Sequence, residues 1–483
     1  MIQSSPDKDV LARNQPMKTL DQPEPATFRL IIVRRHGSEV LFRSDESGWT
    51  LPCAKALPSE RLALQLTTEL DRQFGFRAYC LFIPASLDSN NHVPRWSYAV
   101  LESFAQNDRA PSGTSWVSRA ALEYPDAHAI DDADALMQSL AELDLYAGQA
   151  KAAPFGRSGW FRDLFTWTQD QLSPMGLRLN GRFRQLNASP TFSLIRLETN
   201  GPAVWFKATG NPNRHELPIT LLLSRLFPAN LPPLLGVNQS WNAWLSEEFS
   251  DKTLEQFPEI RIWERVAIEL AELEIASIGK SSALLDGQCK DLRLPRLANL
   301  VAPFLARMAE FMAAQETRSP LPLTIRELDF VGERLEEAFA IHNDLRVPDT
   351  LGHIDLNPGN LLVSPSRCVF LDWAEACVTS PFVTFEYLAE HFRHSNIGGA
   401  EGCQRLVTAY RRPWRAFLSD GELARAIEAS PLIAVFAFAV AGDVWRLPDT
   451  LHRASDVGFL RSLTRRMHRE AVRLAERSVR CSA

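Results

Sequence analysis

The spacing of hydrophobic residues changes along the chain, and the change predicts where strands give way to helices. Near the N-terminus, short apolar runs bounded by turn residues predict four strands, at 28–33, 39–42, 78–83 and 96–101. Apolar residues three and four positions apart predict two helices, at 59–74, ending at Gly75, and at 131–143. We therefore expect a small α+β domain over residues 28–146.

A second β-rich segment is predicted downstream, and helices dominate after it. Residues 192–198 and 204–207 have strand composition and flank the turn residues Asn200 and Gly201. Helical spacing is found at 160–171, 216–227, 259–277, 295–314, 324–342, 382–392, 402–417 and 421–429. This order predicts a small β-rich lobe and a large helical lobe over residues 160–483.

Two segments show neither pattern. Residues 1–27 are polar and rich in proline, without the apolar core of a signal peptide, which predicts a flexible arm. Residues 147–159 are mostly small and include glycine and proline, which predicts a linker between the two domains.

Composition and charge narrow the class of protein. The chain has 483 residues, 45% of them hydrophobic, which suffices for two or three domains with full cores. The net charge is −6 and no basic run is present, so nucleic acid is not expected as a partner. The longest apolar run, 432–442, is too short for a bilayer, so no membrane partner is expected either. Seven cysteines without a C-x-x-C pair favour reduced thiols and a cytoplasmic location.

The chemistry-bearing residues gather in one stretch. His353, Asp355 and Asn360 form the pattern H-x-D-x-x-x-x-N, and a short hairpin then leads to Asp372. Such an order puts one carboxylate beside an incoming hydroxyl. It also brings an amide and a second carboxylate to the same metal ion. Oxygen ligands suit magnesium. Asp, Pro, Gly and Asn alone would indicate only a turn, so the combination carries the prediction of a phosphotransferase site.

This stretch resembles the aminoglycoside phosphotransferase family, within the protein-kinase-like fold, and the resemblance runs from about residue 160 to the C-terminus. Ile354 replaces the glycine that is usual in the family's H-G-D pattern. The resemblance implies that Asp355 is the catalytic base, that Asn360 and Asp372 bind Mg²⁺, and that His353 braces the loop.

An upstream lobe of that family supplies a lysine for the phosphates of ATP. Lys207 ends a predicted strand and Glu216 begins a predicted helix, so the resemblance implies an ion pair that holds Lys207 toward the cofactor. Residues 244–249 are predicted to form the hinge that meets adenine. No glycine-rich loop is found, and its place at 187–191 has no glycine.

The N-terminal α+β domain resembles the Nudix hydrolase fold. Aligned on Gly75, the metal-binding box of that family retains Glu60 and Glu69 but has Arg72 and Gln73 where two adjacent glutamates belong. A positive and a neutral side chain cannot replace two metal-binding carboxylates. We therefore expect a Nudix-like domain without hydrolase activity, with an unrelated small α+β domain as the alternative.

The predicted fold class is α+β: an N-terminal Nudix-like α/β/α domain followed by a bilobal protein-kinase-like fold. The predicted function is ATP-dependent transfer of phosphate to a hydroxyl of a small molecule. A pseudokinase-like regulatory protein and a Nudix-type pyrophosphohydrolase are the alternatives. The acceptor, the choice between ATP and GTP, and the oligomeric state stay open.

Overall fold

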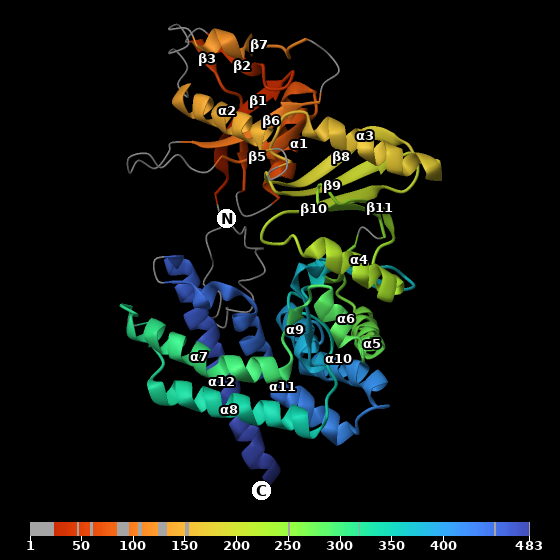
Figure 1. Ribbon diagram of the computed structural model, residues 1–483, viewed down its shortest axis with the longest axis vertical. Helices are drawn as coiled ribbons and strands as arrows, with labels where there is room; N and C mark the ends of the chain where they lie inside the picture. The colour runs from red at the N-terminus through yellow and green to blue at the C-terminus, as the bar shows by residue number, and fades with distance from the viewer. Residues whose placement is uncertain are drawn as a thin grey trace. The chain divides into compact units, whose positions relative to one another are not determined.

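A computed structural model of the protein describes residues 24–45, 48–57, 61–84, 96–104, 109–123, 133–149, 154–249, 252–317, 319–448 and 451–482. These residues form two compact units (Figure 1). Of the described residues, the N-terminal unit comprises 24–217 and 232–248, and the C-terminal unit comprises 218–231 and 249 onward. The predicted arm, residues 1–27, lies almost wholly outside the described residues.

The first sheet of the N-terminal unit has the order β3-β2-β1-β6-β5, with β4 paired to β1 and β7 to β2. Its strands are β1 Ala26–Arg34, β2 Glu39–Asp45, β3 Gly48–Thr50, β4 Cys53–Ala56, β5 Ala78–Phe82, β6 Ser97–Ser103 and β7 Thr114–Ser118. Strands β1 and β6 are parallel, and the other pairs are antiparallel. The four strands predicted for this region are all present, and β3, β4 and β7 are additional.

Strand β1 divides its side chains between two hydrophobic cores, because successive residues of a strand point to opposite faces. Leu30 and Ile32 pack in a core with α1 Leu62–Phe74. Ile31 and Val33 pack in a second core with α2 Ala133–Gly148 and α3 Trp160–Leu172. Helix α1 ends at Gly75, whose left-handed φ of 69° closes the helix, as its sequence predicts.

The second sheet has the order β11-β12-β10-β9-β8 and shares that second core. Its strands are β8 Leu179–Ala188, β9 Phe192–Thr199, β10 Val204–Thr209, β11 Leu234–Asn238 and β12 Ala243–Glu247. Buried polar side chains join the two sheets. The Gln185 side chain bonds both backbone groups of Cys80, at 2.8 and 2.7 Å, and Trp160 Nε1 donates to the Tyr79 hydroxyl at 2.9 Å.

The compact units therefore follow other boundaries than the predicted domains. The β-rich lobe predicted to begin the kinase-like part shares one core with the N-terminal α+β region. Phe155, in the predicted linker, and Trp160, directly after it, are buried in this core. The division at 147–159 into separately folded domains stays a prediction.

The C-terminal unit is mainly helical. Its helices are α4 Glu216–Leu226, which begins at the unit boundary, α5 Ile260–Ser277, α6 Ser281–Asp286, α7 Leu294–Ala313, α8 Ile325–Asp344, α9 Pro381–Ser395, α10 Gly399–Trp414, α11 Asp420–Ala441 and α12 Ala454–Ser482. Thr324 and Glu327 form a capping box that starts α8 close to the predicted position. Two small sheets complete the unit. One has the order β13-β17-β14, with β13 Lys290–Asp291, β17 Ala376–Thr379 and β14 Thr350–His353, and the other pairs β15 Leu361–Val363 with β16 Cys368–Phe370.

Helix α11 differs from its prediction. The sequence predicts a helix at 421–429 and a separate apolar run at 432–442, but one helix continues through Pro431. Its packing against α8, α9 and α12 offsets the hydrogen bond that the proline removes. Among the residues that the structure describes, α11 alone is long and apolar enough to cross a membrane, and 67% of its apolar window is buried.

Candidate active site

The Asp355 loop, residues 353–360, begins at the end of β14 Thr350–His353, an outer strand of the three-stranded sheet in the C-terminal unit. This strand pairs with β17 Ala376–Thr379 in antiparallel register, with His353 opposite Ala376. The loop ends in a 3₁₀ turn, Pro358–Asn360, and continues into β15 Leu361–Val363. Antiparallel pairing of β15 with β16 Cys368–Phe370 returns the chain to Asp372. The hairpin predicted between Asn360 and Asp372 is thus present.

His353 joins the two ends of this hairpin. Its Nδ1 accepts the backbone N–H of Asp355 at 3.2 Å, and its Nε2 donates to the carbonyl of Leu371 at 2.9 Å. The ring also lies 5.0 Å from that of Trp373. A histidine with both ring nitrogens engaged by backbone groups holds the loop in place, which is the bracing arrangement that the sequence predicts for it.

The loop is held by the side chains of its two asparagines. Asn357 Nδ2 donates to Asp355 Oδ1 at 3.2 Å, and Asn357 Oδ1 accepts the backbone N–H of Asn360 at 3.2 Å. Asn360 Nδ2 donates to the backbone carbonyl of Asp355 at 3.0 Å. The amide nitrogen of Asn360 is therefore used to close the loop, which leaves its oxygen as the atom suited to a cation.

A backbone hydrogen bond ties the residue before Asp372 to Asn360. The N–H of Leu371 donates to the carbonyl of Asn360 at 2.8 Å. Asp372 itself has a left-handed backbone, with φ 62° and ψ 53°, and the residue is exposed. A non-glycine residue in that region is uncommon and occurs often at functional sites. The conformation turns the chain sharply between β16 and the following 3₁₀ turn.

The electrostatics of the loop favour a cation. Burial raises the pKa of Asp355, and the negative charges of Asp372 and Glu375 raise it further, against the opposing effects of His353 and of the Asn357 hydrogen bond. A divalent cation between these groups would relieve the repulsion. The oxygens of Asn360 and Asp372 are donors of the kind that magnesium prefers, so the residues present fit that ion. Among the described residues, no cluster of three or more His, Cys, Asp or Glu side chains forms a metal cage.

Two further charged residues lie beside the loop, and the sequence pattern did not single them out. Lys290 Nζ forms an ion pair with Glu375 Oε2 at 2.5 Å, and the backbone carbonyl of Glu375 accepts the N–H of Ile354 at 3.2 Å. Glu375 could have been noticed three residues after Asp372. Lys290 could not, because only the parallel pairing of β13 with β17 brings it there.

Lys207 and Glu216 belong to the N-terminal unit, and they form the predicted ion pair. Lys207 is on β10, whose register places it opposite Leu194 and Trp244. Its Nζ lies 2.5 Å from Glu216 Oε1 and 5.7 Å from the centre of the Trp244 ring. The side chain of Glu216 is 2% exposed and that of Lys207 is 16% exposed. The ion pair fixes the position of the lysine head group.

The segments predicted as the hinge, 244–249, and as the place of the glycine-rich loop, 187–191, both lie partly in β-strands. Residues 244–247 lie in β12, and Arg196 binds the Glu248 carboxylate through two nitrogens, at 2.6 and 2.9 Å. This pairing lowers the pKa of Glu248. Residues 189–191 connect β8 to β9, so the segment predicted in place of a glycine-rich loop is a hairpin turn.

The carboxylate of the N-terminal helix is neutralised by its own neighbours. Arg72 donates twice to Glu69, at 2.8 and 2.6 Å, and Gln73 donates once, at 2.7 Å. The pKa of Glu69 is lowered to about 2, first by the Arg72 hydrogen bond and then by that of Gln73. Glu60 lies outside the described residues. The predicted Nudix-like character of this region stays a prediction.

Comparison with protein families gives one match. Residues 257–417 match the phosphotransferase enzyme family, and this segment contains Asp355, Asn360 and Asp372. The match confirms the prediction that the chain is a phosphotransferase enzyme. No curated protein matches the chain significantly.

Solved structures similar to this chain include three kinases of small molecules. The ethanolamine kinase of Plasmodium vivax is 14% identical, with 61% of this chain and 84% of that chain covered and a TM-score of 0.41. The choline kinase of Cryptosporidium parvum is 13% identical, with 65% and 96% covered and a TM-score of 0.45. Aminoglycoside 2'-phosphotransferase-IIIa, solved as a GDP complex, is 16% identical, with 64% and 98% covered and a TM-score of 0.42.

Proposed function

We propose that the protein is an ATP-dependent phosphotransferase that transfers the γ-phosphate to a hydroxyl group of a small molecule. The observation that carries the proposal is the Asp355 loop. Its hydrogen bonds hold the half-buried carboxylate of Asp355 and the side-chain amide of Asn360 at the start of the hairpin. The hairpin then leads to a second, exposed carboxylate, that of Asp372. This set of oxygens, within a segment that matches a phosphotransferase family, is what phosphoryl transfer requires.

Asp355 acts on the acceptor. Its Oδ1 already accepts one hydrogen bond from Asn357, and the carboxylate retains further lone pairs for the proton of an alcohol. A raised pKa makes the carboxylate a better proton acceptor than an ordinary aspartate, since basicity follows pKa. The loop fixes its direction, so that most of the rate gain comes from orientation and only part from proton transfer.

Asn360 and Asp372 hold Mg²⁺ in this proposal, and Lys207 binds the phosphates that are not transferred. The ion supplies neutralisation of the phosphate charge when it is bound. Glu216 is buried and accepts from Lys207, so it keeps the ammonium group from turning into solvent. The acceptor is proposed only as a hydroxylated small molecule.

The test replaces the carboxylate without changing its shape. Asp355→Asn should leave ATP affinity within about tenfold of wild type and lower phosphoryl transfer by roughly two or more decades, since a positioned base contributes that much. Transfer is measured as ATP-dependent phosphorylation in a screen of hydroxylated metabolites. Asp344→Asn, at the exposed end of α8, is the matched control and should be silent. Near-wild-type transfer by the Asp355→Asn variant would refute the role.

A further inference from the structure

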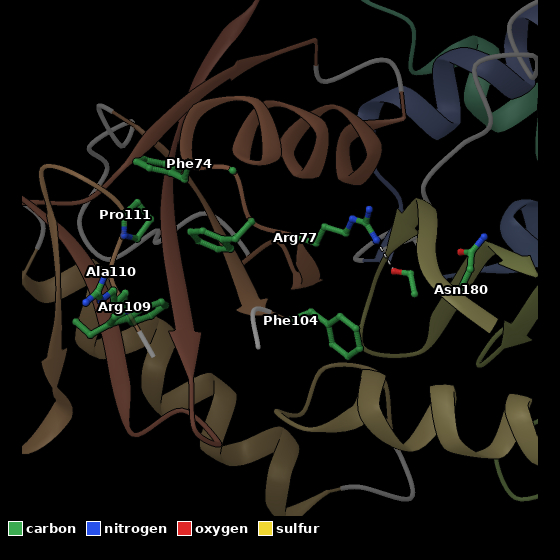
Figure 2. A pocket seen from close by; sticks show the side chains of 11 residues that line it. Phe74, Arg77, Phe104, Arg109, Ala110, Pro111 and Asn180 are labelled. Atoms are coloured by element: carbon green, nitrogen blue, oxygen red, sulfur yellow. Dashed lines mark hydrogen bonds between the residues drawn. The ribbon is translucent and has the colours of Figure 1, made fainter. Parts of the chain in front are cut away.

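The N-terminal unit contains a pocket that the proposed phosphotransferase chemistry does not use. Its volume is about 500 Å³, within the range of small-molecule sites (Figure 2). Four aromatic side chains line it, those of Phe74, Phe76, Phe104 and Trp116. The other lining residues are Gly75, Arg77, Arg109, Ala110, Pro111, Asn180 and Gly181. Within the described part of the chain, no acidic residue lines it.

Both sheets of the N-terminal unit contribute to the walls. Phe74 ends α1, and the chain turns at Gly75 toward β5, so that two rings, those of Phe74 and Phe76, lie 6.2 Å apart and stacked. The ring of Phe76 lies 6.5 Å from that of Trp116 on β7. The opposite wall is the start of β8, at Asn180 and Gly181. Aromatic side chains thus form much of the apolar lining of the pocket.

The charged side chains of the described lining are both arginines. Arg77 points toward β8, where its Nη1 donates to the carbonyl of Gly181 at 2.5 Å (Figure 2). This bond uses one of the five N–H groups of a guanidinium and fixes the direction of the others. Arg109 is exposed at the rim. Arg43 adds a third positive charge, 5.4 Å from the ring centre of Phe74.

The helix end at Gly75 acts in the opposite direction, but it is weaker. The C-terminus of a helix carries about half a negative charge, and its effect fades within one turn. Two full positive charges in the lining outweigh it. The net field of the described lining residues therefore favours an anion.

We propose that this pocket binds a small aromatic anion, whose planar ring packs against Phe74, Phe76 and Trp116 and whose carboxylate or phosphate group pairs with Arg109. Ring packing against aromatic faces supplies apolar burial. A guanidinium is suited to two-point binding of planar anions. One wall of the site belongs to β8, the edge strand of the sheet that carries Lys207, and none of the described lining residues belongs to the Asp355 loop.

The experiment compares two probes that differ chiefly in the sign of their charge. Naphthalene-1-carboxylate and 1-naphthylmethylammonium are titrated into the full-length protein by calorimetry and ligand-observed NMR. The carboxylate should bind at least about tenfold more tightly, as expected for one well-placed charged hydrogen bond. 1-Naphthyl phosphate is titrated beside it. Tighter binding of the phosphate supports the proposal with a phosphorylated ligand, and weaker binding supports it with a carboxylate.

Variants locate the binding. Arg109→Gln should weaken binding of the carboxylate by about tenfold and leave that of the cation unchanged, because only the charge is removed. Phe76→Ala should weaken the binding of both probes. The control is Arg182→Gln, an exposed residue of β8 outside the lining, which should change neither. Circular dichroism checks that each variant is folded. Equal affinity for the two charges, or carboxylate binding that neither Arg109→Gln nor Phe76→Ala reduces, would overturn the proposal.

Discussion

The Asp355 loop and helix α1 both carry acidic residues that the sequence connects with a metal ion, yet the molecule treats their carboxylates in opposite ways. Glu69 on α1 receives three side-chain hydrogen bonds from residues three and four positions later, and its pKa falls to about 2. Asp355 receives one, from Asn357, and its pKa is raised by burial and by two nearby negative charges.

The difference teaches what distinguishes a reactive carboxylate from a satisfied one. On a helix, positions i+3 and i+4 lie beside residue i, so Arg72 and Gln73 reach Glu69 without any tertiary structure. The loop has no such helical neighbours, and most of its hydrogen-bond donors bind backbone groups instead. The negative charge of the loop therefore favours a cationic ligand, whereas that of α1 is already compensated.

The largest effect is expected at Asp372. Asp372→Ala removes the carboxylate that the proposal gives to magnesium, so Mg²⁺-dependent ATP binding and phosphoryl transfer should both be lost while the fold persists. Calorimetry with and without Mg²⁺ measures the binding, and Asp344→Ala is the control. If the variant bound Mg-ATP as tightly as wild type, Asp372 would not be a magnesium ligand, and the proposed difference between the loop and α1 would be wrong.

A smaller loss is expected at the ion pair of the N-terminal unit. Lys207→Met should lower kcat/KM for ATP by roughly one to two decades, because it removes phosphate binding but leaves the metal ligands. Glu216→Gln should have a weaker effect in the same direction, because a lysine that keeps its charge loses only its anchor. Steady-state kinetics at several ATP concentrations measures kcat/KM for both variants and so compares the two effects. A wild-type kcat/KM in the Lys207→Met variant would contradict the assignment.

Thermal melts are the control for both variants of that pair. Removing one partner of a buried ion pair costs about 3–5 kcal/mol, and Lys207 is only partly buried, so the loss of stability should be smaller. A protein that melts normally and has lost ATP affinity separates the functional role from a structural one.

The Asp355 loop could be predicted from sequence because its chemistry is local. His353, Asp355, Asn360 and the hairpin to Asp372 lie within about twenty residues, and turn residues fix their geometry. The ion pair of Lys207 and Glu216 was expected from the family resemblance, which calls for a lysine on a strand and a glutamate on the next helix. Asn357 was passed over although it lies in the same loop, because its role is to bind Asp355 and Asn360.

What escaped prediction depends on contacts between distant segments. Strand β8 has charged and polar residues at most of its outward positions, so it shows only a weak strand pattern and was missed. Its buried Gln185 joins the two sheets through Cys80, more than a hundred residues away. The shared core and the aromatic pocket both rest on that pairing, which no period in the sequence reveals.

Burial also changes the response to acid, and His342 shows it within the C-terminal unit. Its Nε2 donates to the Ala426 carbonyl and its Nδ1 accepts from Ser380, both at 3.0 Å, and burial lowers its pKa to about 4. Between pH 6.5 and about pH 4, His342 is protonated in the unfolded chain but stays neutral in the folded chain. Stability contributed by this residue is therefore complete above pH 6.5 and declines toward pH 4, by up to about 3 kcal/mol.

His342→Gln should flatten that decline, because glutamine does not titrate in this range. Urea unfolding at about pH 7 and about pH 4.5 measures it, a window set by the two pKa values. His394→Gln, on an exposed part of α9, is the control. His391, whose pKa burial also lowers to about 4, should keep part of the dependence in the variant. An equal fall in both proteins between these pH values would mean that His342 is not the group responsible.

The smallest effect is expected on α1, where the comparison predicts none. Full-length protein is the proper sample, since the N-terminal α+β region shares a core with the second sheet. Asp372→Ala, which is expected to abolish phosphoryl transfer, provides the background. In that background the protein should release neither phosphate nor nucleoside monophosphate from nucleoside diphosphate derivatives, with Mg²⁺ or Mn²⁺, because Glu69 is already paired.

Glu69→Gln and Arg72→Ala should leave the melting temperature within experimental error, as is usual for exposed helical ion pairs. Metal-dependent cleavage that disappears in Glu69→Gln would show that a compensated carboxylate can still serve a metal ion, and the difference between the loop and the helix would then be one of degree.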